Sequence, residues 1–199
     1  MKNLIGTMFL GTSICFVCAG LLVLNVPPPH HFAEGLLSDF SKYDRQRNDR
    51  YSHFLAIMDE PSLAPSQGKR SYRFFWLRTF HHPVSVRVTR DSLGAYITAV
   101  ELSGAGGYDP GKVLRRQQTK LTDQQADEFE RALEADGLWT IPAHDDVARR
   151  HMLDGAEWVI EASTTKQRVI TRMSPKNEPA RLMGERFLSL TGWEFGDVY

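Results

Sequence analysis

Two adjacent histidines lie in the stretch FFWLRTFHHPVSVRV, residues 74–88, and are the first candidates for a chemically active site. His81 and His82 could serve as acid–base groups or as metal ligands, since imidazole does both. A zinc site needs three or four converging ligands, and the sequence holds no H-E-x-x-H motif. Pro83 favours an extended His82 and stops regular pairing, so both histidines are predicted to lie where a strand meets a turn. We assign no metal ligand.

Carboxylates are the second candidate group, in the stretch LDGAEWVIE, residues 153–161. They are Asp154, Glu157 and Glu161. Strand alternation places Glu157 and Glu161 on one face, and the opposite face is predicted to be the core. Two carboxylates on one face could do acid–base chemistry or bind a cation. The favoured interpretation is structural pairing with Arg168 and Arg172 of the next strand, whose spacing fits a shared face.

A glycine-rich stretch, SGAGGYDPG at residues 103–111, invites comparison with a phosphate-binding loop. Asp109 stands where a dinucleotide fingerprint needs glycine, and no G-x-x-x-x-G-K-S/T motif occurs. We therefore expect neither a nucleotide nor any other cofactor. The glycines are predicted to make a tight connection, and the alternative is a ligand-facing loop that presents Tyr108.

No residue emerges as a catalytic nucleophile, because the sequence lacks a G-x-S-x-G elbow. Both cysteines, Cys15 and Cys18, lie in the apolar N-terminal run, where a C-x-x-C pair has no setting for redox chemistry. No catalytic residue is assigned. The candidate binding residues are His81, His82, Tyr108, Asp154 and Glu157.

Residues 4–26 are uncharged and predominantly apolar. At about 1.5 Å per residue they reach about 34 Å, enough to span a hydrocarbon core of about 30 Å. Lys2 precedes this run and no Lys or Arg follows until Lys42, so the positive-inside rule predicts a cytoplasmic N-terminus. We expect a single-pass anchor in a bacterial inner membrane, with the rest periplasmic or extracellular. The alternative is a signal peptide cleaved after Ala19 and a secreted product.

Overall charge argues against nucleic acid as a partner. Lys and Arg together number 24, as do Asp and Glu, so the formal net charge is zero. Such a balance creates no field that would steer a polyanion to the surface. The expected partners are the membrane, through residues 4–26, and another protein.

The elements that must position these residues follow from periodicity. Residues 27–68 are predicted to form a proline spacer, an amphipathic helical segment and a linker, and residues 69–199 an α+β domain. The helical segment has an apolar stripe: Leu36, Phe40, Tyr43, Tyr51, Phe54 and Met58. The favoured interpretation is a helix packed on the domain, and the alternatives are a helix that lies on the membrane surface or pairs with a partner helix. Strands are predicted at residues 72–80, 84–90, 95–102, 112–119, 157–162 and 167–172.

Two further helices are predicted within that domain. The first begins at Thr122, which can form a capping box with Gln125, and ends at Gly137. The second covers residues 179–190. The order of sheet, helix, sheet and helix predicts an α+β fold in which an N-terminal transmembrane helix precedes an antiparallel sheet of about six strands, with helices packed on one face.

Residues 72–175 resemble a family of uncharacterised bacterial exported proteins. The resemblance rests on YRFFWLRTFHHPVSVRV, GAGGYDPGK, the Leu138-Trp139-x-x-Pro142 step, LDGAEWVIE and RMSP. It implies an exported α+β domain. The family has no assigned activity, so the resemblance transfers no catalytic residue.

These observations favour a membrane-anchored extracytoplasmic domain with a non-enzymatic binding or protein-interaction role. One alternative is a metal-binding protein or hydrolase that uses His81 or His82 with Asp154 or Glu157. It requires these groups to converge within about 5 Å in a concave pocket. Another is a protective partner that blocks a toxin.

Overall fold

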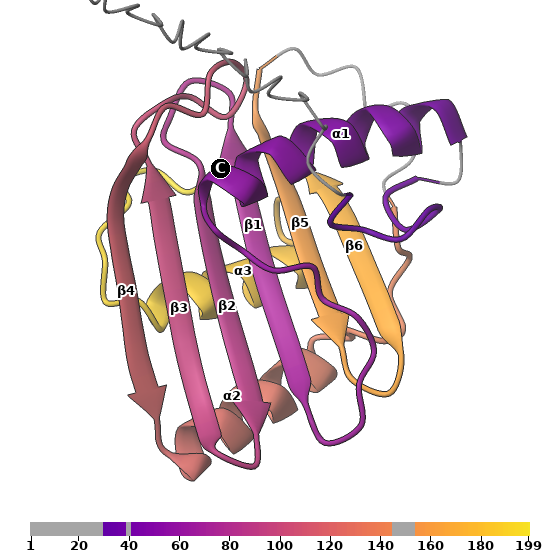
Figure 1. Cartoon of the computed structure of the whole chain (residues 1–199), viewed down its shortest axis with the longest axis vertical. Helices are drawn as coiled ribbons and strands as arrows, with labels where there is room; N and C mark the ends of the chain where they lie inside the picture. Colours follow the sequence, from indigo (N-terminus) through magenta and orange to yellow (C-terminus); the bar gives the residue numbers. More distant parts are fainter. Residues whose placement is uncertain (1–29, 39–40, 145–153) are drawn as a thin grey trace, which may run out of the picture.

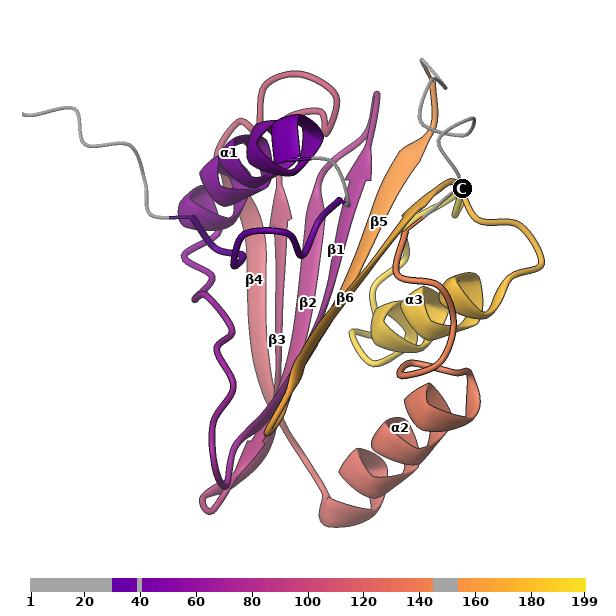
Figure 2. The same cartoon turned by 90° about the vertical axis from the view of Figure 1, so that its right-hand side faces the viewer.

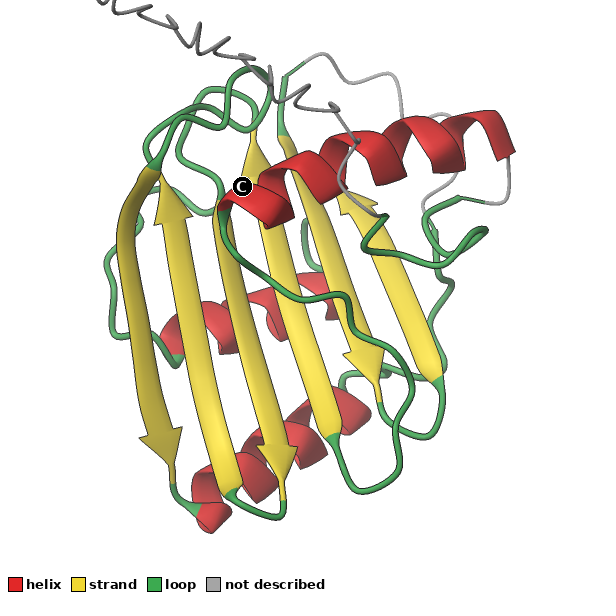
Figure 3. Cartoon of the chain, in the orientation of Figure 1, coloured by secondary structure: helices red, strands yellow, loops and turns green. Residues whose placement is uncertain are grey.

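A six-stranded antiparallel sheet with strand order β4-β3-β2-β1-β5-β6 forms the centre of the molecule (Figures 1 and 3). The computed structural model describes residues 30–38, 41–144 and 154–199. The strands are β1 (Arg70–Arg78), β2 (Val84–Asp91), β3 (Gly94–Leu102), β4 (Val113–Leu121), β5 (Ala156–Ser163) and β6 (Gln167–Met173). The helices are α1 (Ser41–Ile57), α2 (Asp123–Ala135) and α3 (Pro179–Ser189). The predicted α+β class and antiparallel sheet are confirmed.

Helices cover both faces of this sheet, whereas the sequence predicted helices on one face only. Helices α2 and α3 lie on one side and α1 on the other (Figure 2). The prediction was wrong for α1 because β1 is apolar on both faces. Phe74 and Trp76 join the core under α2 and α3, while Phe75 and Leu77 join a second core under α1.

Helix α1 packs through the second half of the predicted apolar stripe. Tyr51, Phe54 and Met58 are buried in the core beneath the helix. Tyr43, which the predicted stripe included, is 47% exposed. The predicted apolar stripe therefore matches the buried face in the second half of α1, which packs on the sheet, and fails at Tyr43 near its start.

Helix α2 begins and ends as its sequence predicts. The Gln125 amide donates to the Thr122 hydroxyl at 3.1 Å, and the Gln125 side chain accepts from the Thr122 amide at 2.9 Å. Gly137 adopts a φ of 87° after the helix, and the Leu138 amide donates to the Leu133 carbonyl. Local hydrogen bonds thus fix both ends and turn the apolar stripe toward the sheet.

The predicted membrane anchor and proline spacer, within residues 1–29, lie outside the described residues. Among the helices that the structure does describe, none has the length and apolar character needed to cross a bilayer.

Helix α3 approaches the sheet closely at Gly184. A Cβ atom there would collide with the Trp158 indole and lie 3.0 Å from the Phe74 ring. Both rings are buried in the core, so neither has room to move. Glycine is therefore required for packing at this position, although it disfavours a helix.

We expect Gly184→Ala to lower the free energy of unfolding by about 1–3 kcal/mol, because overpacking outweighs the better helix propensity of alanine. Chemical denaturation of the two proteins measures the difference. Ser189→Ala, at an exposed position in the last turn of the same helix, is the control and should change stability far less. A stabilised Gly184→Ala variant would contradict this packing.

Candidate functional site

The two histidines lie in the turn after β1, at the upper end of the sheet in Figure 1. The strand ends at Arg78, slightly earlier than predicted. His81 Nδ1 is 2.6 Å from the Tyr199 hydroxyl, and His82 Nδ1 is 3.3 Å from a Glu101 carboxylate oxygen. Both imidazoles thus have partners within the chain, and their predicted place at the end of a strand is confirmed.

Glu157 comes to the same end of the sheet but contacts α1. Its carboxylate accepts hydrogen bonds from Arg50 and Tyr51, and the Arg50 guanidinium also donates to the Gly106 carbonyl at 2.6 Å. Burial, followed by the Glu157 charge, raises the pKa of Tyr51 well above its ordinary value. Glu157 is therefore a structural anchor for α1. The other predicted carboxylate, Asp154, is exposed.

The histidines and Glu157 therefore lie at the same end of the sheet, but they contact residues on opposite faces of it. Glu157 meets residues of α1, whereas His82 meets Glu101, which lies opposite Val84 on the face covered by α2 and α3. No contact between the histidines and Asp154 or Glu157 is present among the described residues. In that part of the chain, no group of three or more His, Cys, Asp or Glu side chains could hold a metal ion.

Glu161 is buried and pairs with Arg73 of the neighbouring strand. Burial raises the pKa of Glu161, and the Arg73 charge opposes that shift. The predicted partners Arg168 and Arg172 were wrong because Glu161 pairs in register with Val169. The hairpin is one residue away from the assumed register, and such a slip moves every side chain to the other face.

The glycine-rich loop folds back over the end of β1. The Gly106 amide donates to the Arg78 carbonyl at 2.9 Å, and the Gly107 amide donates to the Thr79 carbonyl at 3.0 Å. A Cβ at Gly106 would lie 2.6 Å from the Arg78 carbonyl oxygen, so this approach requires glycine. The predicted tight connection is confirmed.

Tyr108 stands out from this loop. Its side chain is 68% exposed, and its ring centroid lies 6.0 Å from that of Phe80, which is also exposed. A ligand-facing role for Tyr108 stays a prediction.

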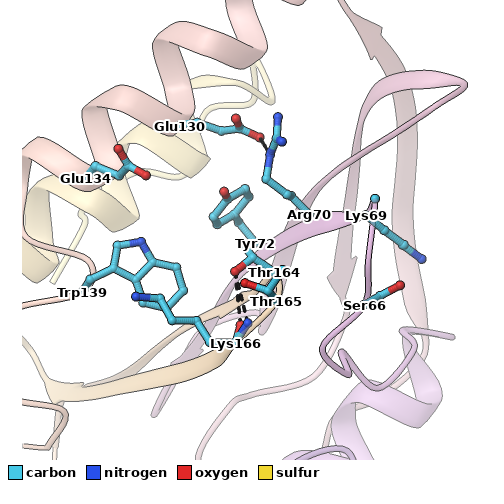
Figure 4. Close-up of a pocket in the computed structure, with 11 residues that line it drawn as sticks. Ser66, Lys69, Arg70, Tyr72, Glu130, Glu134, Trp139, Thr164, Thr165 and Lys166 are labelled. Atoms are coloured by element: carbon cyan, nitrogen blue, oxygen red, sulfur yellow. Dashed lines mark hydrogen bonds and ion pairs between the residues drawn. The ribbon is translucent and has the colours of Figure 1, made fainter.

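An open hollow at the other end of the sheet was not predicted from the sequence. It has a volume of about 590 Å³ and lies between α2, the start of β1 and the β5–β6 turn (Figure 4). Its lining residues are Ser66, Gly68, Lys69, Arg70, Tyr72, Glu130, Glu134, Trp139, Thr164, Thr165 and Lys166. They come from separate segments of the chain that share no recognisable motif. The one feature of the sequence that could have indicated this hollow is Trp139, a large aromatic residue just after the end of α2.

Aromatic rings and paired charges line this hollow. The Lys166 ammonium lies 4.1 Å from the centre of the Trp139 ring, within range of a cation–π interaction. Arg70 donates to the Glu130 carboxylate at 2.9 Å, and Tyr72 lies between these two pairs (Figure 4). The hollow thus combines apolar faces with both signs of charge.

Among the residues that line the hollow, Tyr72 has the side chain whose pKa is shifted most. Burial, and then the Glu130 charge, raise the pKa of its phenol to about 12. The phenol carries its proton at neutral pH, as tyrosines ordinarily do, and the raised pKa extends this protonated range to higher pH. Glu134, one helical turn after Glu130, is exposed and adds a second carboxylate.

Comparison with known proteins provides no relative: no family model, curated protein or solved structure matches the chain. The resemblance to a bacterial exported family stays a prediction.

We expect Glu130→Gln to lower the pKa of Tyr72 from about 12 toward its ordinary value of 10.0, because it removes a nearby negative charge. The pKa stays raised, since burial is the larger cause. NMR titration of ring-labelled tyrosine measures the shift. Glu134→Gln is the matched control and should produce a smaller decrease, because its charge raises this pKa less.

The same shift makes folding stability depend on pH. The folded-state pKa exceeds the unfolded value, so the contribution of Tyr72 is complete below pH 10.0 and is lost as pH rises toward about 12. Tyr72→Phe should remove this part of the pH dependence. An unchanged Tyr72 titration in Glu130→Gln would contradict the described geometry.

Proposed function

We propose that this chain is a non-enzymatic binding module, held at a membrane by residues 4–26, with its folded part on the periplasmic or extracellular side. The observation that carries the proposal is the open hollow between α2, the start of β1 and the β5–β6 turn. Its volume of about 590 Å³ falls in the range of small-ligand and peptide side-chain sites.

The lining of the hollow suits a ligand that has an apolar part and charges of both signs. Trp139 and Tyr72 offer aromatic surface, Lys69 and Lys166 offer cations, and Glu134 offers an exposed carboxylate. Aromatic side chains give contact area with little loss of conformational entropy. A segment of a partner protein carries this mixture of groups.

The contacts of the sequence candidates weigh against the enzymatic alternative. Glu157 binds Arg50 and Tyr51, while His81 and His82 contact Tyr199 and Glu101. A general acid–base pair must reach one reacting group, and these side chains contact opposite faces of the sheet. A hydrolase or metal-binding site built from His81 or His82 with Asp154 or Glu157 would need this end of the domain to rearrange.

The membrane part of the proposal rests on the apolar character of residues 4–26. Their length suffices to span a bilayer, and the lysine before them favours a cytoplasmic N-terminus. A folded part outside the cytoplasm would be free of cysteine, since both cysteines lie in the apolar run.

Topology is tested with single introduced cysteines and a membrane-impermeant maleimide in intact spheroplasts. Thr165→Cys, exposed in the β5–β6 turn, should react, whereas Asn3→Cys should react only after permeabilisation. Each variant is built on a Cys15→Ser, Cys18→Ser background. Labelling of Thr165→Cys only after lysis would refute the proposed topology, and absence of the Asn3 label from the mature chain would show signal cleavage.

Ligand binding is tested with a photo-crosslinking amino acid at Thr165 in the membrane-expressed full chain. We expect a discrete adduct, identified by mass spectrometry, that decreases at least about 5-fold when Trp139→Ala removes the aromatic face. The same crosslinker at Leu93, an exposed position outside the hollow, is the control. Equal adducts at both positions, or adducts insensitive to Trp139→Ala, would overturn the assignment of this hollow.

A further inference from the structure

Residues 193–199, here called the tail, cross the upper end of the sheet on the side of α3. Figure 2 places the end of the chain on that side, and Figure 1 places it near the top of β1. At the start of the tail, the Arg115 guanidinium of β4 lies 4.0 Å from the centre of the Trp193 ring. At its end, Tyr199 meets His81 after β1. The tail therefore spans several strands.

Two buried indoles bind the same atom of the tail. Trp76 Nε1 donates to the main-chain oxygen of Tyr199 at 3.2 Å, and Trp158 Nε1 donates to it at 2.9 Å. Both side chains are essentially inaccessible, at 0% and 1% exposure. Without an acceptor at this point, two buried N–H groups would lose their partner, which is costly.

Two arginines extend this pattern. Arg78 donates to the Phe195 carbonyl at 3.1 Å, and Arg181 of α3 donates to the Val198 carbonyl at 3.0 Å. Side chains of the sheet and of α3 thus donate to main-chain oxygens at three positions of the tail, Phe195, Val198 and Tyr199. Such contacts recognise an extended backbone whatever its side chains, as in other sites that bind peptides through main-chain hydrogen bonds.

The tail itself is only partly embedded. Its apolar side chains, Trp193, Phe195, Val198 and Tyr199, are all half-buried and pack against the core from outside. Gly192 and Gly196 have φ angles of 66° and 64°, and a Cβ at either would meet nothing within 4 Å. The tail is joined to α3 through buried Thr191, whose hydroxyl donates to the Leu188 carbonyl at 2.7 Å and accepts from the Trp193 amide at 2.9 Å, and through exposed Gly192.

We propose that the groove formed by Trp76, Trp158, Arg78, Arg115 and Arg181 is a peptide-binding site that the tail fills in cis, and that an extended acidic peptide with aromatic side chains fills it in trans. Charge supports this choice of partner. The groove presents three arginines, of which Arg78 and Arg115 lie near Glu101 and Arg181 lies near Glu185. The tail carries Glu194 and Asp197, both exposed, and no basic residue, so its attraction to the arginines acts at longer range than a direct ion pair. An incoming peptide would compete with the tail for the same donors.

This inference is independent of the hollow beside α2, which lies at the opposite end of the sheet. Thr165 lines the hollow and is not part of the groove, so a failed crosslink at Thr165 would count against the hollow only. Failure of the groove likewise leaves the proposed function intact.

The test uses the full chain with a specific protease site inserted between Gly192 and Trp193, cut after folding. A fluorescent peptide of residues 193–199, WEFGDVY, is then added in excess. We expect it to replace the cut tail and bind saturably, as measured by fluorescence anisotropy. A peptide with lysine in place of Glu194 and Asp197 is the matched control and should bind about 10-fold more weakly at low salt.

A second measurement identifies the donors. Trp158→Phe keeps an aromatic ring but removes one N–H group, and we expect about 5-fold weaker peptide binding by the cut protein. Circular dichroism and thermal melting confirm that the variant is folded. Three outcomes overturn the proposal: unfolding on cleavage, a cut tail that excess peptide never replaces, or released tail without peptide binding.

Discussion

Strands β1 and β5 are buried on both faces, and this double burial constrains the rest of the fold. Phe74 and Trp76 need cover on one side, while Phe75 and Leu77 need it on the other. A sheet with two apolar faces is stable only between two further layers. Helices α2 and α3 form one layer, and α1 with the segment after it forms the other.

Double burial also explains the charged pair at the centre of the second face. Arg73 and Glu161 are both inaccessible, and each would be destabilising without the other. Arg73 also donates to the Pro61 carbonyl at 2.8 Å, and Arg87 donates to Glu60 at 2.9 Å. The buried charges therefore fasten the segment that leads from α1 into β1, which closes this layer over the sheet.

Local patterns were sufficient to predict the strands and α2, because alternation and capping act between near neighbours in the chain. The partners of Glu161 depend on the exact hairpin register between β5 and β6, which one residue of the turn decides. The face that α1 covers could not be read from β1, since both of its faces are apolar. The hollow was inaccessible to sequence analysis because Tyr72, Glu130 and Trp139 meet only through tertiary packing.

His81 connects the turn after β1 to the tail. Its partner, the Tyr199 hydroxyl, belongs to the residue whose main-chain oxygen accepts from the two indoles, so this residue of the tail is held at both its main chain and its side chain. Each such hydrogen bond contributes only about 1 kcal/mol net, and the tail side chains are half-buried. Opening of the tail would break these hydrogen bonds one segment at a time, as in other local opening events of folded proteins. The donors beneath the tail belong to β1, β5 and α3, so the proposed exchange of the tail for a peptide requires no change in the pairing of the strands.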